Sequence, residues 1–230
     1  MHIAMWSGPR NLSTAMMYSF GARAGARVLD EPFYGAYLTL TGLDHPMGED
    51  IKSSMETDPA LIAEQLLEAD YSKQMTHHMI PGMPRDWFAH VEHAFLIRHP
   101  ARVVASYQVK RENPTLEDIG FTQQAEIFED VRALGKTPFV VDSFDIRAQP
   151  EATLQRLCRK LGIDWDPAML SWSKGGHPAD GIWAKHWYGA VHNSTGFAEP
   201  EGDLPQLEPE LQKIADAAMP YYEALAAHKI

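Results

Sequence analysis

The stretch MHIAMWSGPRNLSTAMMYSFG, residues 1–21, decides the fold. Residues 2–6 form a short apolar run typical of a buried strand, and residues 7–11 hold turn-forming residues with one cation, Arg10. Apolar residues then return at helical spacing, at Leu12, Ala15, Met16 and Phe20. Backbone N–H groups at a helix start, together with the positive end of the helix dipole, attract anions. The stretch therefore predicts a strand, a phosphate-holding turn and a helix, with an ordinary turn as the alternative.

The turn differs from the phosphate-binding loop of nucleotide triphosphate kinases. That loop reads G-x-x-x-x-G-K-[ST]; Thr14 stands at its last position, and Gly8 lies one residue after its first position. Leu12 and Ser13, however, occupy the places of the second glycine and the phosphate-binding lysine. A cation appears earlier in the turn, at Arg10. The sequence thus disfavours a triphosphate kinase and favours an anion site with a relocated cation.

Composition restricts the class of protein. The 230 residues are 45% hydrophobic, enough for the core of a single domain over residues 1–230. No apolar run approaches the roughly 20 residues of a membrane helix, and no charged-then-apolar leader opens the chain. The formal net charge of −11 argues against a nucleic-acid partner. Because the one cysteine, Cys158, allows no intrachain disulfide, we expect a cytoplasmic protein. The absent leader pattern leads us to expect no targeting segment.

Predicted strands and helices alternate along the chain. We expect strands at residues 2–6, 27–29, 71–78 (running into a loop), 94–97 and 139–141. We expect helices from residue 12 and at residues 33–40, 58–69, 100–111, 121–134, 150–161 and 208–227, with long loops at 41–57 and 173–207. This alternation predicts an α/β fold of three layers, a P-loop-like central parallel sheet flanked by helices. In such folds ligands bind at the carboxyl ends of the strands.

Polar residues follow the predicted strands at those carboxyl ends. They are Arg10, Glu31, Lys73 with His77 and His78, Arg98 with Ser106, and Asp142. Arg98 and Ser106 are eight residues apart, and Pro100 suits the first turn of a helix between them. A guanidinium at the strand end and a hydroxyl on that helix can both reach one phosphate. The alternative is an arginine at a sheet edge with a serine on an exposed helix face.

Three segments together resemble the sulfotransferase family. They are SGPRNLST at residues 7–14, IRHPARVVASY at 97–107 and the region 144–162 after the last predicted strand. The resemblance runs in order over roughly residues 3–165. It implies 3′-phosphoadenosine 5′-phosphosulfate as the cofactor and adenosine 3′,5′-bisphosphate as its product.

The resemblance also implies which residues bind this nucleotide. The loop that holds the 5′-phosphosulfate in the family corresponds here to Pro9, Arg10, Asn11, Leu12, Ser13 and Thr14. The motif that holds the 3′-phosphate corresponds to Arg98, Pro100 and Ser106, and a weaker likeness to a late Lys-Gly loop falls on Lys174 and Gly175. The chain departs from the family at Asn11-Leu12, which replace Ser-Gly. It departs again at His77, which is displaced by two positions in the family's K-T-H segment.

The resemblance implies transfer of a sulfuryl group to a hydroxyl or amine of a small acceptor, without a metal. Arg10 and Lys73 are the candidate cations that stabilise charge on the leaving phosphate. Glu31 is the preferred general base, because a carboxylate beside Arg10 would be held and oriented, and His77 or His78 are the alternatives. Four aromatic residues line an acceptor pocket, stack on adenine, or fix the 173–207 loop to the core: Trp172, Trp183, Trp187 and Tyr188.

Two other functions remain open. A P-loop kinase or nucleotide hydrolase would use Asp142 to hold Mg²⁺, but it needs a lysine before Ser13. It would also leave the second motif, residues 97–107 with Arg98 and Ser106, without a role. A non-catalytic nucleotide-binding protein of the same fold finds support in Asn11 and Leu12. The identity of the acceptor and the oligomeric state have no signal in the sequence.

Overall fold

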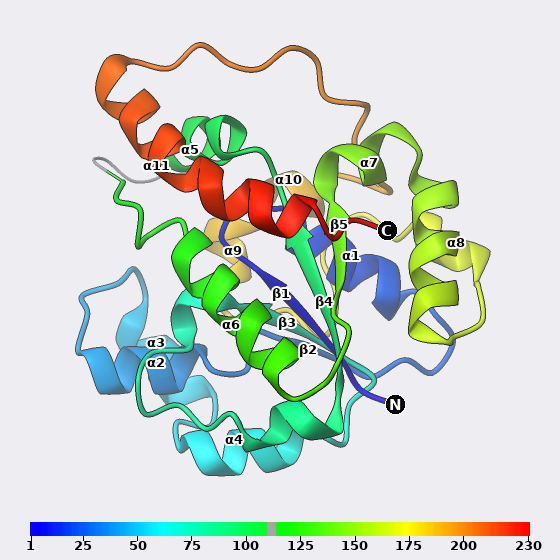
Figure 1. Ribbon diagram of the computed structural model, residues 1–230. Helices are drawn as coiled ribbons and strands as arrows, with labels where there is room; N and C mark the ends of the chain where they lie inside the picture. Colours follow the sequence, from blue (N-terminus) through cyan, green and yellow to red (C-terminus); the bar gives the residue numbers. More distant parts are fainter. Residues whose placement is uncertain (110–113) are drawn as a thin grey trace.

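A five-stranded parallel sheet lies at the centre of the molecule (Figure 1). The computed structural model describes residues 1–109 and 114–230. The strands are β1 (Ile3–Ser7), β2 (Val28–Asp30), β3 (Tyr71–Met75), β4 (Glu92–Ile97) and β5 (Phe139–Asp142), in the order β2-β3-β1-β4-β5. The chain therefore builds the sheet on one side of β1 and then on the other. This reversal at the carboxyl end of β1 is where open α/β sheets bind their ligands.

Helices cover both faces of this sheet, as Figure 1 shows. The longer ones are α1 (Ser13–Gly21), α2 (Tyr34–Thr41), α4 (Pro59–Leu66), α5 (Pro100–Gln108), α6 (Phe121–Ala133), α8 (Pro150–Leu161) and α11 (Pro209–Ala226). The shorter ones are α3 (Gly48–Ser54), α7 (Ser143–Ala148), α9 (Ala184–Trp187) and α10 (Gly189–His192). Single 3₁₀ turns occur at η1 (Thr76–His78), η2 (Asp86–His90) and η3 (Pro167–Leu170). The observed architecture confirms the predicted α/β fold of three layers.

Each face of the sheet has its own core, and β1 contributes to both. Side chains alternate between the two faces of a strand. Ala4 and Trp6 pack into the core beneath α2, α4, α6 and α11, where Trp6 stacks on Trp87 at 5.7 Å between ring centroids. Ile3 and Met5 pack into the opposite core, beneath α1 and α8. All five residues of β1 are buried, which explains its nearly continuous apolar run.

The structure differs from the sequence-based expectation in several short elements. Part of the expected 41–57 loop is the helix α3, which buries Ile51 against α2 and carries acidic residues in its first turn. The expected 173–207 loop contains α9 and α10, because Trp183 and its neighbours pack into the same small core. The second strand ends one residue later than expected and includes Asp30. Residues 110 and 111 of the helix expected at 100–111 lie outside the described residues.

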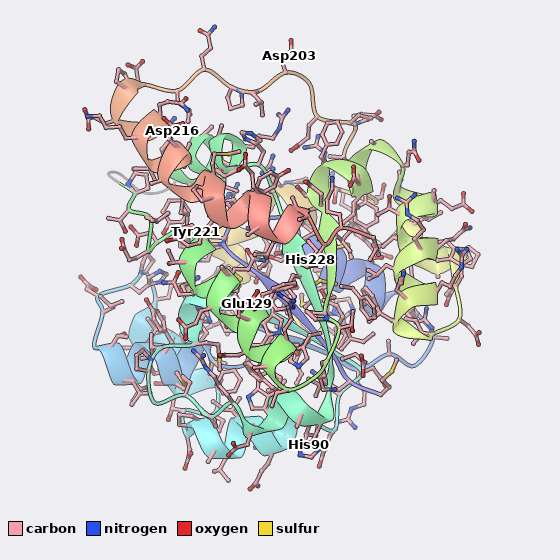
Figure 2. All side chains as sticks on the ribbon, in the orientation of Figure 1. His90, Glu129, Asp203, Asp216, Tyr221 and His228 are labelled. Atoms are coloured by element: carbon pink, nitrogen blue, oxygen red, sulfur yellow. The ribbon has the colours of Figure 1, made fainter. Side chains whose placement is uncertain are left out.

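The closing helix and the connection before it run along the outside of the molecule. The 193–208 connection, orange in Figure 1, crosses the end of the molecule where β4 finishes and leads into α11. Asp203 on this connection is exposed and points outward (Figure 2). Helix α11 contains Pro220 in its interior. Within the described residues, no helix has the length and apolar character needed to cross a membrane.

Candidate functional site

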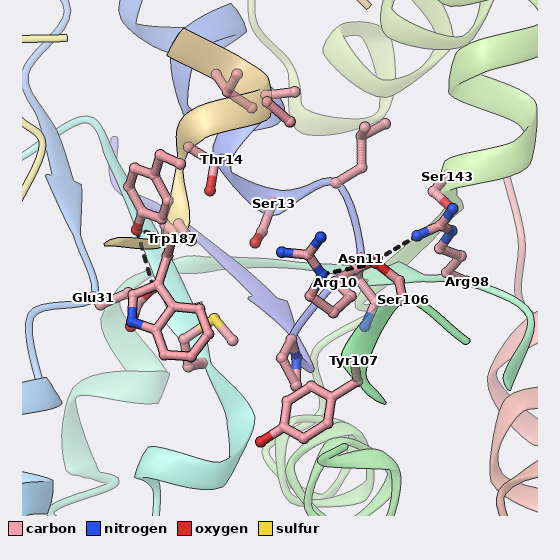
Figure 3. Close-up of a pocket in the computed structure, with 18 of the residues that line it drawn as sticks. Arg10, Asn11, Ser13, Thr14, Glu31, Arg98, Ser106, Tyr107, Ser143 and Trp187 are labelled. Carbon is pink, nitrogen blue, oxygen red and sulfur yellow. Dashed lines mark hydrogen bonds and ion pairs between the residues drawn. The ribbon is translucent and has the colours of Figure 1, made fainter. Parts of the chain in front are cut away.

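A cavity of about 370 Å³ opens at the carboxyl ends of the strands (Figure 3). This volume is within the usual range of small-molecule sites, roughly 300–1,000 Å³. Most residues expected to form the site line it: Arg10, Asn11, Leu12, Ser13, Thr14, Glu31, Lys73, His77, Arg98 and Ser106. Among the described residues that line the cavity, Lys174 and Gly175 do not appear. The binding roles of all these residues stay predictions.

The loop between β1 and α1 is tightly folded around the cavity. Arg10 and Leu12 both have left-handed backbone conformations, with φ of 62° and 70°. Leu12 directly precedes α1, and no described side chain caps the start of that helix. The first N–H groups of α1 are therefore available to an anion in the cavity. The amide Nδ2 of Asn11 donates to the carbonyl of Gly8 at 3.0 Å, and a Cβ at Gly8 would collide with the Ile119 carbonyl oxygen.

Arg10 joins the first loop to the second motif. Its Nε donates to the Ser106 hydroxyl at 2.8 Å, and Arg98 Nη1 donates to the Arg10 carbonyl oxygen at 2.8 Å (Figure 3). Burial, together with the nearby charge of Arg98, lowers the pKa of Arg10 from its ordinary value. No carboxylate of the described residues pairs with Arg10. The positive charge of Arg10 therefore remains available to bind an anion at the centre of the cavity.

A buried network of charges holds Glu31 at the edge of the cavity. Lys73, only 1% exposed, donates to Glu31 Oε1 at 2.7 Å and to Asp30 Oδ1 at 3.1 Å. The Tyr188 hydroxyl accepts from Lys73 and lies 2.8 Å from Asp30 Oδ1 and 3.1 Å from Glu31 Oε1. Trp183 Nε1 donates to the same hydroxyl at 3.0 Å. The carboxylate expected beside Arg10 is thus held by Lys73, its neighbour on the adjoining strand.

The pKa values of this network follow from burial and charge. Burial raises the pKa of Asp30 to about 6, and the adjacent Glu31 adds to the rise while Lys73 opposes it. Burial disfavours the Lys73 ammonium, but the carboxylates of Asp30 and Glu31 outweigh it and raise the pKa of Lys73. Burial also raises the pKa of Tyr188 well above its usual value. Lys73 is thus charged at neutral pH, and two carboxylates compensate that charge.

Of the two candidate histidines, His78 has a packing role. Its ring stacks between Tyr34 and Tyr37, with centroid distances of 4.7 and 4.8 Å. Burial lowers the pKa of His78 well below its ordinary value, so the ring is neutral. Its Nε2 lies 3.9 Å from Glu31 Oε2, beyond hydrogen-bond distance. His77 also lines the cavity, and it contacts the ring of Tyr37.

The second motif ends in a cluster of ion pairs that sequence reasoning missed. Glu201, from the 193–208 connection, receives Arg98 Nε at 3.0 Å and Arg147 Nη1 at 2.8 Å on Oε1. Arg102 Nε lies 3.1 Å from its Oε2. Arg102 stands inside the motif IRHPARVVASY and Arg147 inside the region 144–162, so the local signal was present. Glu201 had no local signal, because it reaches the cavity only by way of the long 193–208 connection.

The four candidate aromatic residues divide between the cavity lining and the core. Trp187 and Tyr188 line the cavity. Trp183 is buried with Tyr188 in the small core under α2 and α3. Trp172 packs edge to face on Tyr18, away from the cavity lining. Among the described residues, no group of three or more His, Cys, Asp or Glu side chains is arranged to hold a metal ion.

Comparison with known proteins gives sequence relatives of different length. The chain is 34% identical over 233 residues to "Branched-chain-amino-acid aminotransferase-like protein 2" of Arabidopsis thaliana. That match covers 98% of this chain and 41% of the Arabidopsis protein. A second protein of that name, number 1, matches at 33% identity over 42% of its length. This chain therefore spans less than half the length of the curated relatives it matches.

The chain is also similar to solved structures and to the model of one protein family. The sulfotransferase domain from the curacin biosynthetic pathway superposes with a TM-score of 0.55 at 15% identity, covering 94% of this chain and 96% of that one. The sulfotransferase domain of the Synechococcus PCC 7002 olefin synthase gives a TM-score of 0.51 at 19% identity, with 94% of each chain covered. These two likenesses show a shared fold. The model of the sulfotransferase domain matches residues 1–229, and the chain belongs to the sulfotransferase family.

Proposed function

We propose that this chain transfers a sulfuryl group from 3′-phosphoadenosine 5′-phosphosulfate to a hydroxyl or amine of a small acceptor. The observation that carries the proposal is the hydrogen bond from Arg10 to Ser106, at 2.8 Å. It joins the loop expected to hold the 5′-phosphosulfate to the motif expected to hold the 3′-phosphate. Two anion sites within one cavity suit a nucleotide with phosphate groups at both ends.

The residues present fit this nucleotide. The uncapped start of α1 and the unpaired charge of Arg10 suit the 5′-phosphosulfate, with Ser13 and Thr14 supplying hydroxyl groups. Arg98 and Ser106 suit the 3′-phosphate. The buried hydroxyl of Ser143 lines the same cavity and has no hydrogen-bond partner among the described residues. When bound, the nucleotide supplies an activated sulfuryl group.

Arg10 and the first N–H groups of α1 are the groups that stabilise negative charge as it develops on the leaving phosphate. Fixed donors of this kind each contribute about 10²–10³ in rate. Lys73 lines the cavity as well, but Asp30 and Glu31 compensate its charge. We therefore assign Lys73 a positioning role, in which its ammonium fixes the carboxylate of Glu31.

Glu31 is the proposed general base that removes the acceptor's proton. Its carboxylate lines the cavity and is oriented by Lys73 and Tyr188. Its backbone φ of +46° is one that non-glycine residues rarely adopt. His77, which also lines the cavity, is the second candidate. The aromatic rings of Tyr34 and Trp187 line the space in which an acceptor would lie.

The alternative function as a kinase or nucleotide hydrolase requires Asp142 to hold Mg²⁺. In the structure Asp142 Oδ1 accepts from the Phe144 backbone N–H at 2.9 Å and caps α7. The Tyr222 hydroxyl donates to Oδ2 at 2.7 Å. Asp142 is 2% exposed, and the cavity lining drawn from the described residues does not include it. These bonds commit Asp142 to a structural role.

Isothermal titration calorimetry with three nucleotides tests the proposal. We expect adenosine 3′,5′-bisphosphate to bind more tightly than AMP, because only the former offers a phosphate to Arg98 and Ser106. We expect ATP with Mg²⁺ to bind more weakly than the bisphosphate, because the loop lacks the lysine of the kinase motif. Tighter binding of ATP, or no binding of the bisphosphate, would overturn the proposed donor.

A further inference from the structure

The Glu201 carboxylate occupies a cluster of three arginines. Arg98 follows β4, Arg102 lies on α5 and Arg147 on α7, so three separate elements converge on one carboxylate. The side chain of Glu201 is only 2% exposed, although Gly202 and the residues after it are exposed. An exposed connection has therefore inserted one buried anion into the wall of the cavity.

The arginines hold the connection as well as the carboxylate. Arg147 Nε donates to the Glu199 carbonyl oxygen at 2.7 Å, and Arg102 donates to the Gly202 carbonyl. These contacts are side chain to backbone and do not depend on the identity of the residue in the connection. The carboxylate of Glu201 is the only charge that the connection contributes to the cluster, within the described ion pairs. The ion pairs of this contact thus depend on the side chain of Glu201.

The cluster has the chemistry of a phosphate subsite. Three guanidinium groups face a single carboxylate, so positive charge exceeds negative charge at this point. Planar guanidinium groups match the oxygen atoms of a phosphate at least as well as those of a carboxylate, and a phosphate monoester carries more negative charge. Arg98, Arg147 and Glu201 all line the cavity proposed to hold the nucleotide.

A second observation points to a ligand at the same place. Ser143 is fully buried, and its hydroxyl has no hydrogen-bond partner among the residues described. It lines the cavity, and Figure 3 draws it at the same end as Arg98. A buried hydroxyl without a partner destabilises the fold, because it has lost its hydrogen bonds to water. A phosphate oxygen in the arginine cluster would supply the missing acceptor.

We propose that Arg98, Arg102 and Arg147 form the subsite for the 3′-phosphate and that Glu201 closes this subsite until the phosphate displaces it. This inference rests on the proposed function, since the proposed donor carries the 3′-phosphate. Glu201 acts as an internal competitor, and the 193–208 connection withdraws when the nucleotide binds. Only molecules in which Glu201 has left the cluster can then bind the 3′-phosphate. The apparent affinity is the intrinsic affinity multiplied by the fraction of such molecules.

The test compares Glu201→Gln with a matched control, Asp203→Asn. Both changes remove one negative charge from the same connection, but Asp203 is exposed and points away from the cluster (Figure 2). Calorimetry should show adenosine 3′,5′-bisphosphate binding roughly tenfold more tightly to Glu201→Gln than to the unmodified chain, because the closed fraction is lost. Binding of AMP should stay within about twofold, and Asp203→Asn should behave as the unmodified chain.

The outcomes separate this inference from the proposed function. If the unmodified chain prefers the bisphosphate to AMP and Glu201→Gln leaves that preference unchanged or weaker, Glu201 is no competitor and the proposed donor stands. If both nucleotides gain equally, the effect is one of net charge and the inference fails. If neither protein binds the bisphosphate, the proposed donor fails, and the inference fails with it.

Hydrogen–deuterium exchange on the unmodified chain tests the withdrawal without any variant. Saturating bisphosphate should speed exchange of the backbone amides in residues 199–203, because the arginines release the connection. Saturating AMP should not change it. Slower exchange in this segment with the bisphosphate would mean that the connection closes over the nucleotide, and it would refute displacement of Glu201.

Discussion

Replacing Lys73 by methionine should destabilise the fold strongly at neutral pH. The ammonium lies 2.7 Å from Glu31 and 3.1 Å from Asp30, and it is 1% exposed. Each pair is worth about 5–6 kcal/mol at an effective dielectric constant of about 20. Desolvation of the buried ammonium offsets several kcal/mol of this sum, so we expect a net loss of about 3–5 kcal/mol on breaking the network.

The loss should depend on pH in a direction set by Asp30. Without Lys73, the two adjacent carboxylates favour the uptake of one proton by the folded state. A folded state that binds one more proton than the unfolded chain gains about 1.4 kcal/mol of stability for each unit by which the pH falls. In the unmodified chain the pKa of Asp30 is already raised to about 6. Below that pH, the stability of both proteins therefore rises equally as the pH falls. The deficit of Lys73→Met should therefore shrink by about 2 kcal/mol between pH 7.5 and 6.

Urea unfolding followed by circular dichroism at pH 7.5 and 6.0 measures this difference. The double variant Lys73→Met with Asp30→Asn removes one charge of each sign, and we expect it to be more stable than Lys73→Met alone at pH 7.5. It should also lose most of the extra pH dependence. A deficit below about 1 kcal/mol, or one that is equal at the two pH values, would refute the assignment of Lys73 to a compensated buried network.

Three further predictions concern the site and the core. Glu31→Gln should lower the turnover number by about 10²–10⁴ while leaving calorimetric binding of adenosine 3′,5′-bisphosphate unchanged; full activity would move the base to His77. Arg98→Ala should remove most of the preference for the bisphosphate over AMP, roughly 10- to 100-fold, since charge-assisted hydrogen bonds contribute about 1.5–3 kcal/mol; unchanged discrimination would exclude Arg98 from the 3′-phosphate site. His93 accepts the Trp6 indole N–H at 2.9 Å, and burial lowers its pKa from 6.5 to about 4. Because the unfolded chain binds this proton first, His93 should cost about 2 kcal/mol of stability as the pH falls from 7.5 to 5. His93→Gln should therefore show a shallower loss in urea unfolding over that range, and an equal loss would contradict the assignment.

The strands and the long helices could be predicted from the sequence because their signals are local. Buried strands such as 139–142 appear as short apolar runs, and α8 begins with Pro150 and is followed by Gly162, its left-handed C-cap. The short helices α3, α9 and α10 could not be predicted in this way. Each has seven residues or fewer and depends on tertiary packing around residues such as Ile51 and Trp183.

The site was predictable where the chemistry lies at strand ends, and it was not where distant segments meet. The cavity collects Arg10, Arg98 and Ser106 because parallel strands finish at the same edge of the sheet. The expectation that Arg10 holds Glu31 was wrong, because the cation that pairs with Glu31 is Lys73. Asp30 and Lys73 are direct neighbours in the register of β2 and β3, and that register is not visible in a single sequence.

The loop that opens the chain is strained, and this strain fits the anion site that we propose there. Arg10, Leu12 and Glu31 have left-handed backbones and line the cavity, while Met47 is the fourth such non-glycine residue among those described. A left-handed conformation costs an L-residue about 1–2 kcal/mol. At Leu12, where the related family has glycine, the loop adopts this conformation without the glycine. The hydrogen bonds of Asn11 to Gly8, of Arg10 to Ser106 and of Arg98 to Arg10 offset the cost. Such bonds are what we expect of a loop that directs its N–H groups and one guanidinium toward an anion, as in the proposed function.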